Sequence, residues 1–516
     1  MKFAVMCLKI IMIARDGANI SLWQNTSEPF VPTRQISTNQ NYDVVIAGGG
    51  ITGVSTAFLL QQAGLRCVLL EAHTLCFGTT GGTTAHLNTL LDTPYTTIAD
   101  NFGAANATLV AQAARSAINT ITTNIEMLQI DCNFEEASAF LFSQNEKQTQ
   151  ELESIRKATA EAGVSATYTD TIPLSIQFEK ALEIKNQAKF HPVRYVMALA
   201  KAFEDAGGTI VQHCRVMDTD NTDPLVVKTA AGDLHTSWLI YTTHIPPGVN
   251  LLHLRCAPYR SYAMAVRLVN DNYPAGLTYD MYDPYHYYRT QLIDGDQYLI
   301  IGGEDHKTAH AENTNVPFTK LESHIRSHFD IRGIAYRWSS QYFEPADGLP
   351  YIGHLPGNPG KILVATGFGG NGMTYSSVAA RLLADIVLDK ENPYTELFDP
   401  NRIKPIAGFT NFLKENVDVA KQLITGFFSK EKIHALADIA PGEGKVVQVD
   451  GHTIALYKDE AGAIHTLNSR CTHLKCTVSW SLAEKCWECP CHGARYDADG
   501  KVLTGPADMD LQKIVL

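Results

Sequence analysis

A glycine triplet between two short apolar strands constrains the fold of this 516-residue chain more than any other feature. Residues 42–53 read YDVVIAGGGITG and contain Gly48, Gly50 and Gly53. An apolar helical pattern follows, and a second strand, CVLLE, ends at Glu71. The first glycine permits a tight turn, the second lets the backbone approach a pyrophosphate, and the third lets the helix pack closely on the strand. Because a helix N-terminus attracts phosphate and a strand-end acid can bind ribose hydroxyls, this order of elements predicts a dinucleotide-binding βαβ unit.

Composition and charge narrow the class of protein. The length suits about three domains of roughly 150 residues, and 45% hydrophobic and 19% charged residues are ordinary for a globular protein. Acidic side chains outnumber basic ones, 54 to 42, and the net charge of −12 would repel a phosphate backbone, so we expect no nucleic-acid partner. No uninterrupted apolar run reaches about 18 residues, so we expect no transmembrane segment.

The first residues, MKFAVMCLKIIMIARDG, look superficially like an export signal. Lys9 interrupts the apolar run, however, and no small-x-small cleavage site follows it. We therefore expect residues 1–40 to be an N-terminal extension that begins as a frayed tail, with Met12 as an alternative start. For the same reason we expect a cytoplasmic protein.

Five of the eleven cysteines gather between Cys471 and Cys491, and histidines stand among them, whereas the other six are scattered singly. The segments Cys471-Thr-His473 and Cys489-Pro-Cys-His492 together offer two thiolates and two imidazoles. Zinc could bind such a set tetrahedrally, and a [2Fe–2S] centre could take two cysteines on one iron and two histidines on the other. The four residues alone leave both alternatives open.

The surrounding sequence favours the iron–sulfur alternative. CTHLKC and CPCHGARYDADGKVLTGPA, set among short predicted strands, resemble the Rieske family. The resemblance implies a GPA loop that covers the cluster and a disulfide between Cys476 and Cys491, as in respiratory-type Rieske proteins, which leaves Cys486 free. It implies a [2Fe–2S] cluster with four ligands: Cys471, His473, Cys489 and His492.

One departure from the Rieske family affects the reduction potential. High-potential members have a serine, hydrogen-bonded to a bridging sulfide, where this chain has Ala494. Tyr496 keeps the second hydrogen bond, to a cysteine sulfur. Since a missing donor destabilises the reduced, more negative cluster, we expect a potential below that of respiratory-type centres.

A second resemblance covers roughly residues 40–402. After Glu71 come the loop AHTLCFGTTGGTTAHLN and the segments FHPVRYVMALAKAFEDAGGTIVQHCRV, YTTHIP, DGLPYIG and VATGFGGNGM. In this order they resemble the D-amino-acid oxidase-like superfamily of FAD-dependent amine oxidoreductases. The two resemblances imply an α/β FAD-binding domain (Rossmann-like, glutathione-reductase-type) with an interleaved mixed-sheet substrate domain, followed by a small all-β Rieske domain.

The flavoprotein resemblance also implies where FAD binds. Thr79 and Thr80 would lie near the pyrophosphate and ribityl chain, Val216 would meet the adenine, and residues 368–373 would approach the isoalloxazine ring. The full set of implied contacts is Gly48, Gly50, Ile51, Thr52, Gly53, Glu71, Ala72, Thr79, Thr80, Val216, Thr243, Phe368, Gly369, Gly370, Asn371, Gly372 and Met373. Some relatives attach FAD covalently through a histidine where this chain has Gly82, with His86 four residues later. We therefore expect noncovalent FAD.

A second glycine motif, Gly367-x-Gly369-x-x-Gly372, follows an apolar strand and precedes a helix. No second strand with a terminal acid comes after that helix, so the motif does not predict another dinucleotide fold. A helix N-terminus aimed at the N1/O2 edge of the flavin, where it stabilises the anionic reduced ring, fits better. The flavin is then reduced by a substrate rather than by NAD(P)H.

Candidate substrate contacts come from the predicted strands YRSYAMAVRL and MYDPYHYYRT, although sheet packing explains these residues equally well. They are Tyr259, Arg260, Tyr262, Tyr288 and Arg289. His306 and His310, beside Glu304 and Asp305, could bind mononuclear iron if they lay on a helix. Because GGED follows a predicted strand, we do not expect that site.

These observations predict an N-terminal extension (1–40), a flavin module (41–402), a connecting helix (403–430) and a Rieske domain (431–516). The expected function is a dehydrogenase that oxidises a small amine or amino acid with FAD and passes electrons through the cluster to an acceptor, a protein or a quinone. The alternative is an electron carrier or redox sensor without small-molecule turnover. A Rieske-type oxygenase is a third hypothesis and requires the mononuclear iron site.

Overall fold

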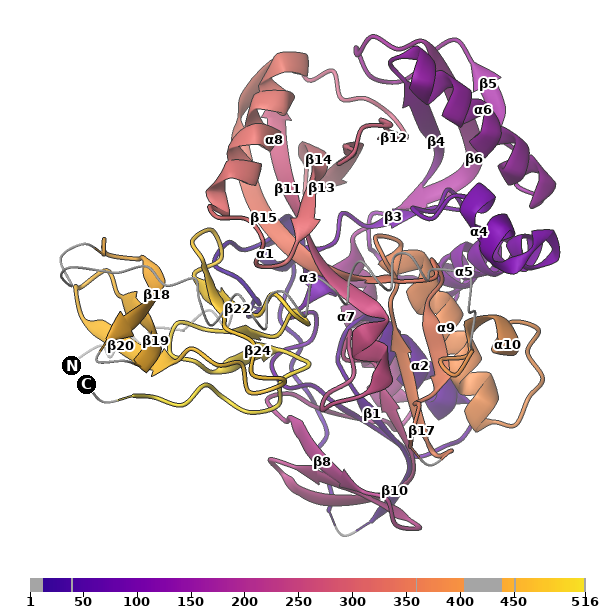
Figure 1. Cartoon of the computed structure of the whole chain (residues 1–516). Helices are drawn as coiled ribbons and strands as arrows, with labels where there is room; N and C mark the ends of the chain where they lie inside the picture. Colours follow the sequence, from indigo (N-terminus) through magenta and orange to yellow (C-terminus); the bar gives the residue numbers. More distant parts are fainter. Residues whose placement is uncertain (1–12, 39, 359, 403–438, 450–451, 515–516) are drawn as a thin grey trace, which may run out of the picture.

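The computed structural model describes residues 13–38, 40–358, 360–402, 439–449 and 452–514. The expected connecting helix over residues 403–430 therefore lies outside the described residues. The described chain forms two large β-sheets and, in its C-terminal part, two small ones (Figure 1).

The first large sheet has eight strands in the order β16-β17-β10-β1-β2-β7, with β9 paired to β10 and β8 to β9. Strands β17, β10, β1, β2 and β7 pair in parallel, as the buried β-branched runs predict. In β1, Val44 and Ile46 face one hydrophobic core while Val45 faces another, so the strand is buried on both sides. The strand bounds are β1 (Asn41–Ala47), β2 (Cys67–Leu70), β7 (Thr209–Val211), β8 (Val216–Asp220), β9 (Leu225–Thr229), β10 (Gly232–Tyr241), β16 (Tyr351–His354) and β17 (Ile362–Thr366).

Three helices complete this nucleotide-binding unit. Helix α2 (Ile51–Gln62) packs against α7 (Pro192–Asp205) and α9 (Gly372–Val387). Gly64, with φ of +90°, allows the chain to reverse directly after α2 and enter β2. Helix α9 follows β17, and the short helix α10 (Thr395–Phe398) comes next, so no second βαβ unit forms among the described residues.

The second large sheet is the interleaved substrate domain. Its order is β15-β11-β14-β13-β12-β4-β6-β3, with β5 paired to β6, and all pairs are antiparallel except β12 with β4. Its strands come from both sides of β7–β10 in the chain, which confirms the predicted interleaving. The bounds are β3 (His86–Leu87), β4 (Glu135–Ser143), β5 (Thr167–Thr169), β6 (Lys180–Lys189), β11 (Cys256–Leu268), β12 (Leu277–Tyr279), β13 (Tyr287–Ile293), β14 (Asp296–Lys307) and β15 (Ile331–Pro345).

Helices cover parts of this second sheet. Helix α8 packs on β11 and β14, and α6 packs on β4 and β6. Helices α4 and α5 pack on each other, and α5 also contacts α9 of the nucleotide-binding unit. The bounds are α4 (Tyr95–Phe102), α5 (Ala104–Leu128), α6 (Glu146–Glu161) and α8 (Asn315–His328).

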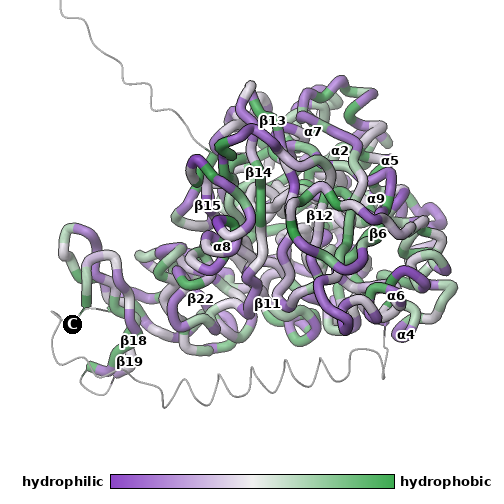
Figure 2. The backbone as a smooth tube through the Cα atoms, turned by 90° about the horizontal axis from the view of Figure 1, so that it is seen from above, coloured by the Kyte–Doolittle hydropathy of each residue, from purple (hydrophilic) through white to green (hydrophobic). Residues whose placement is uncertain are grey.

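The C-terminal part is all-β, as predicted. One sheet joins β18, β19 and β20, and the other joins β21, β22, β23 and β24, both in antiparallel order. Two views agree that β18 and β19 lie at one end of the molecule and α4 and α6 at the other (Figure 1, Figure 2). The bounds are β18 (Gly444–Val449), β19 (His452–Lys458), β20 (Ile464–Asn468), β21 (Ser479–Ser481), β22 (Cys486–Glu488), β23 (Arg495–Tyr496) and β24 (Val502–Thr504).

The N-terminal segment is integral to the flavin module from Ile13 onward. Trp23, in the short helix α1 (Leu22–Asn25), is fully buried, and its Nε1 donates to the carbonyl oxygen of Thr83 at 2.6 Å. Asp16 is also buried, and it pairs with Arg495 of the C-terminal domain at 2.9 Å. The described residues of this segment therefore supply packing and a buried charge, whereas the expected frayed start, residues 1–12, lies outside the described residues.

Candidate flavin and iron–sulfur sites

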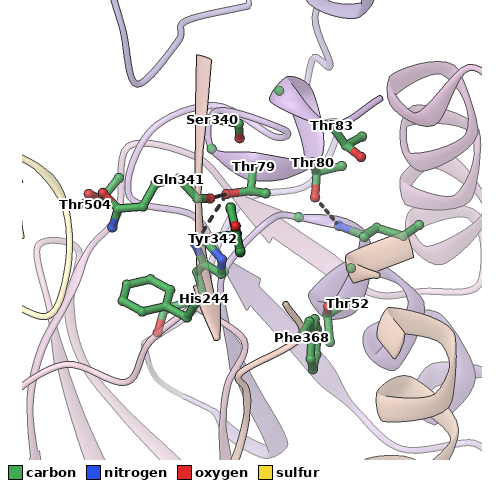
Figure 3. A pocket seen from close by; sticks show the side chains of 18 of the residues that line it. Thr52, Thr79, Thr80, Thr83, His244, Ser340, Gln341, Tyr342, Phe368 and Thr504 are labelled. Atoms are coloured by element: carbon green, nitrogen blue, oxygen red, sulfur yellow. Dashed lines mark hydrogen bonds between the residues drawn. The ribbon is translucent and has the colours of Figure 1, made fainter. Parts of the chain in front are cut away.

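A pocket lies at the carboxyl ends of β1, β2, β10 and β17, where a doubly wound sheet binds its ligand (Figure 3). Every predicted FAD contact except Gly53 lines this pocket. Gly53 instead serves close packing: a Cβ atom there would lie 1.9 Å from the carbonyl oxygen of Gly48. The tertiary structure thus brings together six sequence segments that the resemblance assigned to one cofactor.

The glycine turn leaves the N-terminus of α2 open to the pocket. Gly48 has φ of +112°, which favours glycine, and Gly50 is the N-cap of α2 with no side-chain cap. A Cβ atom on Gly50 would lie 2.9 Å from Oγ1 of Thr80. That hydroxyl accepts a hydrogen bond from the amide of Ile51 at 3.1 Å (Figure 3). The cradle therefore has room for a pyrophosphate only because residue 50 has no side chain.

Glu71 supports the glycine turn from the next strand. Its Oε2 accepts a hydrogen bond from the amide of Gly49 at 2.7 Å, and its Oε1 accepts one from the amide of His73 at 2.8 Å. Burial raises the pKa of Glu71, and these two hydrogen bonds oppose the rise. The carboxylate thus fixes the loop, and its contact with ribose stays a prediction.

Thr79 links the cradle to the substrate sheet. It begins the short helix α3 (Thr79–Gly82), and its Oγ1 donates to the carbonyl oxygen of Gln341 at 2.8 Å. The same hydroxyl lies 3.3 Å from Nδ1 of His244, a residue beside the predicted contact Thr243. Burial lowers the pKa of His244 to about 4, so this imidazole is neutral at pH 7. Figure 3 shows these side chains converging on one wall of the pocket.

The second glycine motif forms another wall. Asn371 is the N-cap of α9, and its Oδ1 accepts a hydrogen bond from the amide of Asp92 at 2.8 Å. A Cβ atom on Gly370 would meet Oδ2 of Asp92 at 2.0 Å, so the loop needs glycine there. This wall places the N-terminus of a long helix at the pocket, as the sequence predicts.

Gly82 and His86, the two positions considered for covalent attachment of FAD, have different surroundings. A Cβ atom on Gly82 would lie 2.8 Å from Oγ of Ser340, so a histidine could not be added there without movement. His86 lines the pocket, and its Nδ1 lies 2.6 Å from the hydroxyl of Tyr279. Burial lowers the pKa of His86 well below its usual range, so the ring is neutral.

None of the five candidate substrate contacts lines the pocket, so the structure corrects that expectation. Arg260 pairs with Glu488 at 2.6 Å, and Arg289 donates to the carbonyl oxygens of Thr84 and Ala85. Tyr262 bonds to His306, Tyr288 bonds to His324, and Tyr259 stacks on Tyr342.

The sequence did not point to six further residues that line the pocket. They are Asp92, Tyr279, Tyr285, Tyr287, Asp305 and Tyr342. Because successive side chains of a strand point to opposite faces, the sequence could have placed Tyr287 and Tyr288 on different faces. It could not have shown which of the two faces the cofactor.

The hypothetical mononuclear iron site does not assemble. His306 lies on strand β14, which ends at Lys307, and His310 lies beyond the strand in the turn that follows, so the two residues do not share a helical face. Nδ1 of His306 lies 2.7 Å from the carbonyl oxygen of Lys307, and Nδ1 of His310 lies 3.0 Å from that of Thr308. The geometry therefore gives no support to an oxygenase iron site at His306 and His310.

The four predicted cluster ligands converge from two loops of the C-terminal domain. The rings of His473 and His492 lie 4.9 Å apart, and a hydrogen bond from Cys489 lowers the pKa of Cys471 to about 7. His492 is 2% exposed, yet neither of its ring nitrogens has a hydrogen-bond partner among the described residues, and the same holds for His473. Imidazoles whose buried ring nitrogens lack other partners, together with two buried cysteines, fit a metal cluster.

Two predicted features around these ligands are confirmed. Cys476 and Cys491 form a disulfide with Cα atoms 6.5 Å apart, and Cys486 is a free, buried cysteine. The hydroxyl of Tyr496 lies 3.2 Å from Sγ of Cys471. Ala494 is fully buried and offers no hydroxyl to a sulfide.

The GPA loop faces the flavin pocket. Thr504, Gly505, Ala507 and Asp508 are among the residues that line the pocket, and the carbonyl oxygen of Pro506 accepts a hydrogen bond from the amide of Gly248 at 3.3 Å. Figure 3 places Thr504 beside Gln341. The iron–sulfur domain therefore forms part of the wall of the flavin site.

The fold and the two sites define a FAD-dependent oxidoreductase joined to a Rieske domain. The family described as FAD dependent oxidoreductase matches residues 43–386, and the Rieske [2Fe-2S] domain matches residues 429–514. The chain belongs to the FAD dependent oxidoreductase family and carries a C-terminal Rieske domain. It binds FAD in the first module and a [2Fe–2S] cluster in the second.

Individual relatives share either the whole chain or one module. The Rieske 2Fe-2S iron-sulfur protein YhfW of Bacillus subtilis (strain 168) is 35% identical over 498 residues, which cover 96% of this chain and 97% of that protein. Gamma-glutamylputrescine oxidoreductase of Escherichia coli (strain K12) is 23% identical and covers 71% of this chain and 88% of its own. Glycine oxidase from Geobacillus kaustophilus has a similar fold, with a TM-score of 0.59 at 19% identity, covering 71% of this chain and 100% of that structure.

Within the described residues, no helix is both long and apolar enough to cross a membrane.

Proposed function

We propose that this protein is a dehydrogenase that oxidises a small amine or amino acid with FAD and delivers the electrons singly, through its own Rieske cluster, to a protein or quinone acceptor. The observation that carries this proposal is the contact between the two sites: Nε2 of Gln341, which lines the flavin pocket, donates to the carbonyl oxygen of Gly493 at 2.9 Å. Gly493 directly follows the cluster ligand His492.

The chemistry that FAD supplies is hydride acceptance: the C–H bond beside the substrate nitrogen breaks, its electron pair and hydrogen pass to FAD, and the nitrogen lone pair forms the C=N bond. The chain binds and orients the reactants. The N-termini of α2 and α9 face the pocket, where the first favours pyrophosphate and the second favours negative charge on the reduced ring. With no covalent attachment proposed, these backbone groups carry much of the cofactor binding.

Buried ion pairs hold the two modules in one arrangement. Arg260 lies 2.6 Å from Glu488, and Arg495 lies 2.9 Å from Asp16 and 3.4 Å from Glu488. All four side chains are at most 4% exposed. Removing one partner of such a buried pair costs about 3–5 kcal/mol, because it leaves an uncompensated charge. A domain fixed in this way suits a relay with a constant distance between donor and acceptor.

A closed or absent cavity beside the flavin would favour the alternative function, an electron carrier or redox sensor without substrate turnover. The pocket has further polar and aromatic lining residues beyond the predicted FAD contacts, including Tyr279, Tyr285 and Asp305. These residues support the enzyme over the alternative.

The test is an anaerobic reduction of the purified protein by amines and amino acids. We expect substrate to bleach the flavin absorbance first and to produce the Rieske electron paramagnetic resonance signal next. His492→Ala should abolish that signal and stop electron delivery to a one-electron acceptor, while the flavin is still bleached. Rapid, stoichiometric peroxide formation that is unchanged in His492→Ala would overturn the relay.

A further inference from the structure

The flavin pocket continues into a wall of tyrosines. Tyr279, Tyr285, Tyr287 and Tyr342 all line it. The ring centroids of Tyr285 and Tyr287 lie 5.7 Å apart, and the ring of His86 lies 5.3 Å from Tyr279 and 5.8 Å from Tyr287. The electron-rich faces of such rings attract a cation that has left water.

Two acidic residues, Asp305 and Asp92, line the same pocket as these tyrosines. Asp305 lies on β14, where its Oδ1 accepts a hydrogen bond from Ser261 at 2.5 Å and its Oδ2 accepts one from Tyr342 at 2.9 Å. Asp92 also lines the pocket, and its Oδ2 lies beside Gly370. Burial, and then the charges of both carboxylates, raise the pKa of Tyr285 well above its usual range.

In the described part of the chain, no arginine or lysine lines the pocket beside these carboxylates, although His286, which does not line the pocket, lowers the pKa of Asp305. Enclosure raises the pKa of Asp92 to about 6 and that of Asp305 to about 7. Among the described residues that line the pocket, Arg215 is the one arginine or lysine. Arg215 adjoins Val216, at the part expected for adenine, and donates to the carbonyl oxygen of Val502 at 3.0 Å. Arg289 is occupied by the carbonyl oxygens of Thr84 and Ala85 and does not line the pocket.

This distribution of charge discriminates between the two substrate classes of the proposed function. An α-amino acid would bring its carboxylate toward two carboxylates, with no cation to meet it, and like charges in an enclosed site repel strongly. A protonated amine would meet two carboxylates and four aromatic rings. The geometry therefore favours a cation throughout the substrate part of the pocket.

We propose that the substrate is a positively charged amine with no carboxylate on the reacting carbon, and that Asp92, Asp305 and the tyrosine wall hold its ammonium group. The inference rests on the proposed function and names the substrate class of the same site. It concerns binding; before the C=N bond forms, the ammonium loses one proton to the carboxylate that holds it, because only the free amine has a lone pair.

Matched pairs that differ by one carboxylate test this inference. The probes are phenethylamine and phenylalanine, and tyramine and tyrosine. Mixed anaerobically with the FAD-loaded protein, each probe gives a dissociation constant from the shift of the flavin spectrum and a rate from its bleaching. We expect at least one amine to bind and bleach, with its amino acid binding about tenfold or more weakly, a difference of about 1.4 kcal/mol.

Substitution of Asp305 and Asp92 tests whether these two acidic residues bind the amine. Asp305→Asn and Asp92→Asn should each weaken amine binding by about tenfold without weakening amino-acid binding. Two separate variants are used in case one of them does not fold. Retained FAD and a Rieske signal show that a variant is folded. Asp233→Asn, an exposed acid on β10, is the matched control and should leave both constants unchanged.

The outcomes separate the two proposals. An amino acid that binds or bleaches as well as its amine would overturn the substrate inference and leave the dehydrogenase proposal standing. If neither member of any pair perturbs or bleaches the flavin, both proposals fail.

Discussion

Nε2 of Gln341 donates a 2.9 Å hydrogen bond to the carbonyl oxygen of Gly493, while the backbone carbonyl of Gln341 accepts one from Thr79 at 2.8 Å. One residue of β15 therefore touches both the predicted flavin cradle and the loop that carries His492. A Cβ atom on Gly493, whose φ is +74°, would lie 2.6 Å from Nε2 of Gln341, so the contact is close as well as polar. Through this contact, a change in the flavin site can alter the cluster site.

Gln341→Ala should slow electron transfer from flavin to cluster and leave flavin reduction by substrate unchanged. The substitution removes the hydrogen bond and the packing against Gly493, each of which positions the cluster loop. Stopped-flow absorbance can follow the two steps separately. Gln150→Ala, on the exposed side of α6, is the control. Equal slowing of both steps would assign Gln341 to the substrate site instead.

Arg260→Ala should lower the free energy of unfolding by about 3–5 kcal/mol, because it leaves Glu488 buried with a weakened counter-charge. Since the pair joins the two modules, the variant should also become sensitive to proteolysis between them. Denaturant unfolding and limited proteolysis measure these effects. Arg267→Ala breaks an exposed pair with Asp296 and should cost about 1 kcal/mol or less. Similar losses in both variants would contradict a structural role for the buried pair.

Gly50→Val should abolish FAD binding and leave the iron content intact. The new side chain would meet Thr80 and occupy the space in front of the N-terminus of α2. Flavin absorbance and iron analysis of the purified protein give the result. Gly333→Val, where a Cβ atom meets nothing within 4 Å, controls for adding a branched residue. Retention of FAD by the Gly50 variant would place the cofactor elsewhere.

Acid precipitation should release the yellow chromophore into the supernatant, because the expected FAD attachment is noncovalent. Position 82 is a glycine packed against Ser340, and a histidine cannot replace it there without movement. Colour that stays in the pellet would point to His86, which lines the pocket. His86→Ala would then release the colour.

Ala494→Ser should raise the reduction potential of the cluster, and Tyr496→Phe should lower it. A hydroxyl at position 494 can donate to a sulfide and stabilise the reduced state, whereas the second change removes the donor 3.2 Å from Sγ of Cys471. A redox titration followed by the Rieske signal measures both. Tyr457→Phe, in the same domain, is the control. A wild-type potential as high as that of respiratory-type centres would contradict the reasoning.

The sequence was sufficient for features that depend on local order or on a family resemblance. The spacing of the glycines and Glu71 predicts the βαβ unit, whereas the resemblances imply the interleaved sheets, the cluster ligands and the disulfide between Cys476 and Cys491. The structure confirms the disulfide, and the four cluster ligands stay a prediction. Most predicted FAD contacts line one pocket because strand ends and the glycine turns after them meet at one edge of the sheet. Gly53 has the packing role that its place in the triplet predicts.

Only the tertiary structure shows which residues line the substrate part of the pocket and which residues join the two domains. Tyr287 and Tyr288 are adjacent in the sequence, yet only Tyr287 lines the pocket, because successive side chains of a strand point to opposite faces. Asp92 and Asp305 come from distant segments that share no motif and meet only when the second sheet covers the first. Arg260, which the sequence suggested as a substrate contact, is bound by Glu488 of the other domain. Local sequence thus determined which cofactors the chain can hold, whereas the packing of sheets and domains decided which charges face them.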